Sequence, residues 1–213
     1  TNGFRIRHCA VTYTNNQLSA CTPFTVDAGG AQASHPAVAI SPADGSLTIA
    51  WQSDPTSNPG LNSRVLARRR ASNGTWGATE TVSTVPPYYG RASNGNEVNV
   101  DNGPSLLITS NGARHLVFNQ HFDSTGDYGR VIYVTDSGSG WTTTSLNWYS
   151  HASAIAVGAN GQLAIIGHGG APSTNAVAAC KNNRNMCYAL KPVGASWGQA
   201  QLLVQYTGDL SYD

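Results

Sequence analysis

Charge is scarce in this chain. Charged residues make up 11% of its 213 residues, against about 25% in an average soluble domain. The formal net charge is +1, which gives no long-range attraction to nucleic acid or to an anionic membrane. The run of three arginines at residues 68–70 is the local exception. Because it ends a predicted strand just before a turn, it indicates a solvated edge.

Long apolar runs and common catalytic motifs are also missing. No apolar segment reaches the length of a transmembrane helix, so no membrane span is expected. The chain has no P-loop, no HExxH sequence and no nucleophile elbow. Its cysteines do not follow a zinc-binding spacing. We therefore expect no cofactor and no metal site.

The four cysteines fall into two pairs. Cys9 and Cys21 flank a predicted turn at residues 13–17 and lie nearly opposite each other, and Cys180 and Cys187 close a short loop. This pattern predicts two disulfides, with buried free thiols or metal ligation as the alternatives. Together with the low Lys and Glu content, two disulfides favour an extracellular, secreted protein.

A strand–turn–strand pattern occurs three times, at residues 35–51, 103–118 and 151–167. Asx-Gly between two apolar runs is a strong signal for a β-hairpin with a type I′ turn, which needs positive φ at both central residues. The three turns centre on Asp44-Gly45, Asn111-Gly112 and Asn160-Gly161.

A second turn, Gly-x-Trp or a close variant, follows each hairpin and contains Trp76, Trp141 or Trp197. An apolar strand precedes it, so each unit has four antiparallel strands, A to D. Such units in series predict an all-β fold, a β-propeller built from blades. The predicted single segment, 1–213, holds three blades and a half blade, with bounds 4–26 (half blade), 35–82, 103–146, 151–203 and 207–213 (start of a next blade). Because the ring is incomplete, we expect the remaining blades to come from another chain or a missing part of this polypeptide.

The Gly-x-Trp turn resembles the Asp-box (BNR) repeat of sialidase-like β-propellers, whose fuller pattern is Ser-x-Asp-x-Gly-x-x-Trp. Each copy keeps only part of the box: Ser72, Gly74 and Trp76; Asp136, Gly138 and Trp141; Gly194 and Trp197. The resemblance implies that each Trp packs into the blade beside its turn and that the site lies at the opposite face. Stacking of the Trp on a ligand is the alternative.

The B–C loops and D–A linkers are long and lie at one face of the predicted blades, here called the long-loop face; the short A–B and C–D turns form the turn face. Loops on a rigid scaffold commonly hold binding sites. Aromatic rings mixed with charged and polar groups suit sugars. The binding candidates are Tyr88, Tyr89, Arg91, Asp123, Tyr128, His151 and His168. Side chains that are merely solvated are the alternative.

Catalysis is left open by the sequence. The catalytic candidates are Glu97, Asp101 and His121. Glycosidases use two carboxyl groups, whereas a lyase would use His or Tyr as a base, for which His121, Tyr128 and His151 are candidates. Sialidases also need an arginine cluster and a Tyr–Glu nucleophile pair. Under the resemblance, Arg91 with Glu97, or Tyr88 and Tyr89, would supply parts of these. We expect an extracellular recognition or assembly module that binds a glycan or a partner protein. The alternative is a carbohydrate-active enzyme, either a sialidase-like glycoside hydrolase or a polysaccharide lyase.

Overall fold

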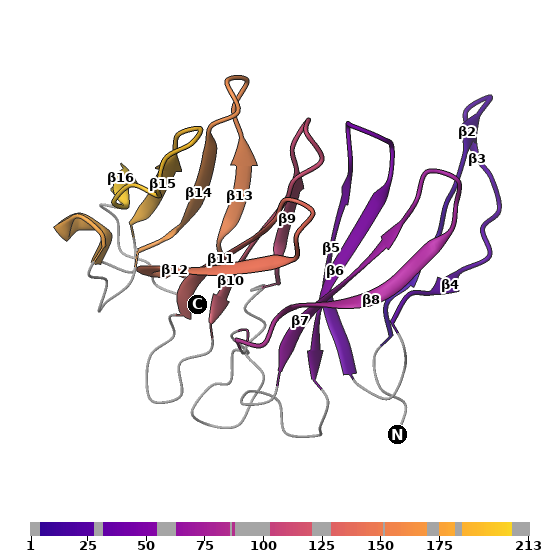
Figure 1. Cartoon of the computed structure of the whole chain (residues 1–213), viewed down its shortest axis with the longest axis horizontal. Coiled ribbons are helices and arrows are strands. Elements are labelled where there is room, and N and C mark those ends of the chain that lie inside the picture. The colour runs from indigo at the N-terminus through magenta and orange to yellow at the C-terminus, as the bar shows by residue number, and fades with distance from the viewer. Residues whose placement is uncertain are drawn as a thin grey trace.

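Three four-stranded antiparallel sheets follow one another along the chain (Figure 1). This computed structural model describes residues 5–27, 32–54, 63–85, 87, 103–120, 129–150, 152–169, 175–181 and 185–205. Blade 1 contains β5 (Gln32–Ile40), β6 (Leu47–Asp54), β7 (Arg64–Arg70) and β8 (Trp76–Ser83). Blade 2 contains β9 (Ser105–Ile108), β10 (Arg114–Gln120), β11 (Gly129–Asp136) and β12 (Trp141–Ser150). Blade 3 contains β13 (Ala154–Val157), β14 (Leu163–His168), β15 (Met186–Lys191) and β16 (Gln201–Val204).

A half blade precedes these sheets. It pairs β1 (Arg7–His8) with β4 (Phe24–Thr25), and the hairpin β2 (Tyr13–Thr14) and β3 (Gln17–Leu18) extends from it. In the described ranges the helical element is one 3₁₀ turn, η1 (Ala178–Lys181). The predicted fold class, a β-propeller segment of three four-stranded blades and a half blade, is confirmed.

The A–B turns differ from the predicted type. The Asx carboxyl or amide oxygen accepts a hydrogen bond from the backbone N–H two residues on: Asp44 from Ser46, Asn111 from Ala113, Asn160 from Gln162. Positive φ occurs only at the following glycines, 70° at Gly45, 82° at Gly112 and 78° at Gly161. The type I′ prediction is therefore wrong. The Asx side chain holds its own turn, and glycine takes the left-handed position that a Cβ would strain.

Apolar cores lie between consecutive blades. Blade 2 is covered on both faces, and Leu116, Val117 and Phe118 in β10 are all fully buried. In the flanking blade 3, β14 alternates: Leu163 and Ile165 are buried, whereas Ile166 is 37% exposed. Continuous apolar sequence therefore marks the doubly covered sheet, and alternation marks the sheet with one covered face.

The three repeated tryptophans each contact the preceding blade. Trp76 stacks on Phe24 of the half blade, with ring centroids 5.6 Å apart. Trp141 donates its indole N–H to Glu80 of β8 over 2.8 Å. Trp197 meets Tyr133 of β11 edge-on at 5.0 Å. The tryptophans are packing residues, as predicted, but they join neighbouring blades instead of packing beside their own turns.

The arginine run at residues 68–70 also joins blades. The Arg68 guanidinium lies 5.5 Å from the Trp76 ring centroid and donates to the carbonyl of Val26 in the half blade over 2.9 Å. Arg69 forms an ion pair with Asp44 across the A–B turn. The expectation of a solvated edge is thus wrong for Arg68, because its flat cation is used to cover an aromatic ring.

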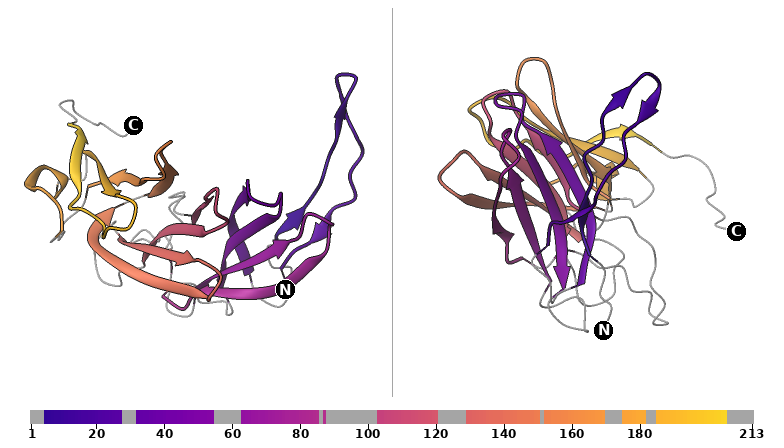
Figure 2. Two further views of the ribbon diagram at one scale, coloured as in Figure 1. Left: turned by 45° about the horizontal axis from the view of Figure 1, so that its top comes forward. Right: turned by 90° about the vertical axis from the view of Figure 1, so that its right-hand side faces the viewer.

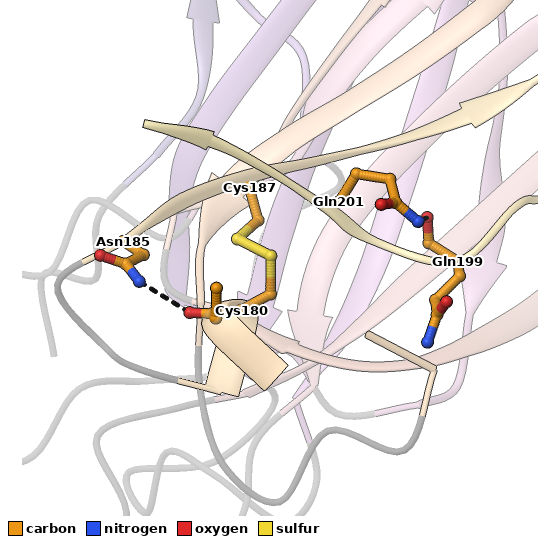
Figure 3. The surroundings of a disulfide bond; sticks show 6 residues. Cys180, Asn185, Cys187, Gln199 and Gln201 are labelled. Carbon is orange, nitrogen blue, oxygen red and sulfur yellow. Dashed lines mark hydrogen bonds between the residues drawn. A yellow bond between two sulfur atoms is a disulfide. The ribbon is translucent and has the colours of Figure 1, made fainter. Parts of the chain in front are cut away.

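Both predicted disulfides are present. Cys9–Cys21 closes the base of the β2–β3 hairpin, which projects from the blades (Figure 2), and Cys180–Cys187 ties η1 to β15 (Figure 3). Their Cα atoms are 5.8 and 5.9 Å apart, the usual disulfide range. Beside the second bond, Asn185 donates to the carbonyl of Ala179. Two disulfides fit an extracellular protein, and no helix in the described part of the chain is long and apolar enough to cross a membrane.

Substitution of Trp141 tests its role between blades. Trp141→Phe keeps an aromatic ring beside Arg114 and loses the hydrogen bond to Glu80, so the free energy of unfolding should fall by about 1 kcal/mol. Trp141→Ala also removes the packing and should cost roughly 3 kcal/mol. Urea unfolding followed by circular dichroism measures both losses. The exposed neighbour Thr142→Ala is the control, and equal effects at both positions would contradict the role.

Candidate functional site

The strand ends at the long-loop face are the described part of the predicted binding surface. Of the binding candidates, only His168 lies within it, exposed at the end of β14 and opposite Met186. The other candidates lie outside the described residues: Tyr88, Tyr89, Arg91, Asp123, Tyr128 and His151 for binding, and Glu97, Asp101 and His121 for catalysis. The geometry of this face is therefore built from the residues at the roots of its loops.

Asn119 connects three segments at this face. Its side chain is 1% exposed, and its amide nitrogen donates to the carbonyls of Gly129 and Ser150 over 3.3 and 2.8 Å. Its amide oxygen accepts from the backbone N–H of Ser153 over 3.1 Å. One side chain thus fixes the end of β10, the start of β11 and the connection from blade 2 to blade 3.

The start of β11 fits closely against this amide. A Cβ at Gly129 would lie 2.5 Å from the carbonyl oxygen of Gln120 and 2.8 Å from the Asn119 Cβ, so only glycine fits there. The next residue, Arg130, donates to the Tyr149 hydroxyl over 2.9 Å. Arg64 occupies the matching position in blade 1 and is exposed. The two arginines are repeat positions, each in its own blade.

Asp27 is a buried carboxylate at the junction of the half blade and blade 1. It is 7% exposed, accepts the backbone N–H of Ile6 over 2.8 Å and pairs with the Arg5 guanidinium at 2.5 Å. Its charge is compensated on both oxygens by groups of the half blade. Asp27 therefore has a structural role.

A charge cluster lies between blades 1 and 2 towards the turn face. Arg114 of β10 forms two hydrogen bonds with Glu80 of β8, at 3.1 and 2.8 Å, and an ion pair with Asp136 of β11. Its guanidinium lies 4.5 Å from the Trp141 ring centroid. Asp136 also accepts the backbone N–H groups of Gly138 and Gly140 in the turn that precedes Trp141.

The cluster shifts the pKa values of its members. Burial opposes ionisation of Arg114, but hydrogen bonds with Glu80 and Asp136 outweigh it and raise the pKa of Arg114. Burial likewise opposes ionisation of Asp136, yet the hydrogen bonds from Arg114 and Gly138 lower its pKa. Both groups are therefore held in their charged forms.

Two cavities open between the blades. One of about 270 Å³ lies between blades 1 and 2, lined by Arg69, Arg114 and Asp136, whose charges are already paired. The other, of about 320 Å³, lies between blades 2 and 3 and is lined by residues that include Tyr133, Lys191 and Trp197. Across the described ranges, no group of three His, Cys, Asp or Glu side chains is placed to hold a metal ion.

Comparison with known proteins gives similarity at the level of fold. No protein-family model and no curated protein matches the chain. An N-acetylgalactosamine deacetylase from F. plautii, solved with blood group B trisaccharide, has a TM-score of 0.51 at 13% identity, covering 86% of this chain and 56% of its own. A protein of unknown function from Dyadobacter fermentans has a TM-score of 0.50 at 14% identity, covering 79% and 54%. A Hadza microbial sialidase has a TM-score of 0.49 at 15% identity, covering 80% and 37%.

The chain therefore spans between 37% and 56% of the length of these structures. At such identities the deacetylase and the Dyadobacter protein support the fold alone and nothing finer.

Sequence reasoning missed the residues that organise both faces. Asn119 has a recognisable signal: it and Gln52 are amides that follow an apolar run at the same place in strand B, and both are 1% exposed. The charge cluster has a weaker signal, because Glu80 and Arg114 belong to different blades and no local pattern relates them.

Removing the cation from the cluster should produce a pH-dependent loss of stability. At pH 7, Arg114→Met leaves two neighbouring carboxylates without their cation and should cost roughly 3 kcal/mol. Because the folded-state pKa of Asp136 is lowered, its stabilisation is present above the unfolded value of about 3.9 and is lost as the pH falls through the folded pKa. The difference in free energy of unfolding between wild type and variant should therefore be smaller at pH 3 than at pH 7.

Urea unfolding at pH 7, 5 and 3 measures this gap. The exposed Arg64→Met is the matched control and should show little change at any pH. A gap that stays constant down to pH 3 would contradict the electrostatic explanation.

Proposed function

We propose that the protein is an extracellular β-propeller module that recognises a glycan or a partner protein through its long-loop face. The observation that supports this is the buried hub at Asn119, which holds the roots of a long loop and of the next blade by three hydrogen bonds. Binding loops need such a rigid base, because a mobile base would add ordering cost to every encounter. The binding residues proposed are Tyr88, Tyr89, Arg91, Asp123, Tyr128, His151 and His168.

The second candidate is a carbohydrate-active enzyme, a sialidase-like glycoside hydrolase or a polysaccharide lyase. The fold is shared with a deacetylase that was solved with a trisaccharide, which favours a sugar as the ligand class. Catalysis would fall to Glu97, Asp101 and His121. A hydrolase requires two carboxyl groups at about 5–10 Å with different pKa values.

Loop substitutions separate recognition from stability. Tyr89→Ala and His121→Ala should weaken binding on a glycan array or to a captured partner, with little change in melting temperature, because loop side chains add little to the core. Trp141→Ala should lower the melting temperature instead. Binding that survives the loop changes but is lost on altering the Gly-x-Trp turns would place recognition on the other face. Polysaccharide cleavage that is lost in Glu97→Gln, Asp101→Asn or His121→Ala would favour the enzyme.

We also propose that further propeller strands, from another chain or from more of this polypeptide, cover the two end faces of the array. Val38 and Ile40 of β5, in the blade that follows the incomplete half blade, are 62% and 67% exposed, and Leu203 and Val204 of β16, in blade 3, are 48% and 54% exposed. Light scattering should give a mass above the 22.3 kDa of the chain. Val38→Lys with Ile40→Lys should reduce association without unfolding the sheet, since both side chains are exposed. A lone monodisperse monomer of 22.3 kDa would contradict this proposal.

A further inference from the structure

The interface between blades 2 and 3 repeats the one between blades 1 and 2, but with its charge cluster replaced. Strand register defines the equivalent positions. In strand D, Glu80 pairs with Ala67 of strand C in blade 1, and Thr144 pairs with Tyr133 of strand C in blade 2. Thr144 is therefore the residue equivalent to Glu80. The first residue of strand B and the last of strand C are Arg114 and Asp136 in blade 2, and Leu163 and Lys191 in blade 3.

These replacements leave a hollow where the charge cluster would be. Thr144, Lys191, Trp197 and Tyr133 all line the cavity of about 320 Å³. Trp141 donates its indole N–H to Glu80, whereas the buried indole nitrogen of Trp197 has no hydrogen-bond partner in the part of the chain that the structure describes. The interface between blades 2 and 3 thus keeps the donor, the indole N–H of Trp197, but has Thr144 in place of the carboxylate acceptor.

The cavity also carries an unbalanced positive charge. Lys191 is half-buried and makes no ion pair with any of the described residues, whereas every charge of the first cluster is paired. Burial lowers the pKa of the nearby His115, and the charge of Lys191 lowers it further, so His115 does not add a second cation. One ammonium group is therefore available to a ligand.

The remaining lining is polar and open on one side. Ser145, Asn147 and Ser196 are exposed and offer hydroxyl and amide groups. The wall is fixed: Asn175 donates its backbone N–H to the carbonyl of Asn147, and its side-chain amide donates to the carbonyl of Leu146. The volume is at the small end of ligand sites, enough for about one sugar ring.

The geometry points to a second binding site in this cavity, for a single saccharide unit that carries an anionic oxygen group, a carboxylate or a sulfate ester. The anion pairs with the Lys191 ammonium as a charge-assisted hydrogen bond. The sugar hydroxyls meet the serine and asparagine side chains, and the apolar face of the ring lies against Trp197. The site is separate from the long-loop residues proposed above.

The test uses the whole chain and three probes: trigalacturonate, a sulfated galactose and neutral galactotriose. The indole ¹⁵N–¹H signal of Trp197, assigned with Trp197→Phe, should shift on titration with the anionic probes and not with the neutral one. A response to only one anionic probe identifies the source of the anion. Equal responses to the neutral probe, or no response to any probe, would overturn the site.

The two lysines of the chain provide a matched pair of variants. Lys191→Gln should weaken binding about tenfold or more, whereas Lys181→Gln, at an exposed lysine outside the cavity, should leave it unchanged. Equal loss in both would mean non-specific attraction. Thr144→Glu restores the acceptor found at Glu80, so it should pair with Lys191 and abolish binding while the melting temperature holds or rises. Retained binding in folded Thr144→Glu, or tighter binding of an acidic peptide than of either saccharide, would also overturn the proposal.

Discussion

The contact of one tryptophan with the preceding blade is the interaction on which the array depends. A single four-stranded sheet buries one face poorly, and its stability comes from packing against a neighbour. In each repeat the Trp that follows the turn contacts the preceding blade. Apolar side chains fill the middle of each interface, and the ring closes its outer end. This fixes the spacing between sheets.

The turn sets the position of the ring, but the preceding blade supplies its partner, and the three partners differ. Trp76 meets Phe24 of the half blade, Trp141 meets Glu80 of blade 1, and Trp197 meets Tyr133 of blade 2. The arginines that cover the first two rings, Arg68 and Arg114, belong to the same blade as the ring. Because the ring and its partner in the preceding blade belong to different repeats, the partner can change without altering the turn that holds the ring. Each interface can therefore become a rigid charge cluster, a cation–aromatic stack or a cavity on one scaffold.

Much of the fold could be predicted because it depends on local signals. Apolar alternation and repeated turns located the strands, and the cysteine spacing located both disulfides. The turn type could not be predicted from the Asx-Gly pair alone. The Asp44 carboxylate accepts the backbone N–H of Ser46, and this side-chain bond favours a different turn from the type I′ turn. The role of Arg68 and the charge cluster depend on contacts between blades, which local pattern does not contain. For the site, loop lengths and residue types could be predicted from the sequence. The role of Asn119 could not, because its hydrogen-bond partners are 10 to 34 residues away in the chain.

The comparison of Asn119 with Gln52 indicates where the repeat has been modified. Both amides are 1% exposed at the same position of strand B. Asn119 satisfies its hydrogen bonds because blade 3 begins within a few residues of β12, so Ser153 lies within reach. Blade 1 ends at Ser83 and β9 begins at Ser105, and the Gln52 amide nitrogen has no partner among the residues described around it. A buried unpaired amide costs about 1–3 kcal/mol. Among the described residues, Gln52 therefore lacks the bond to the next blade that Asn119 makes through Ser153.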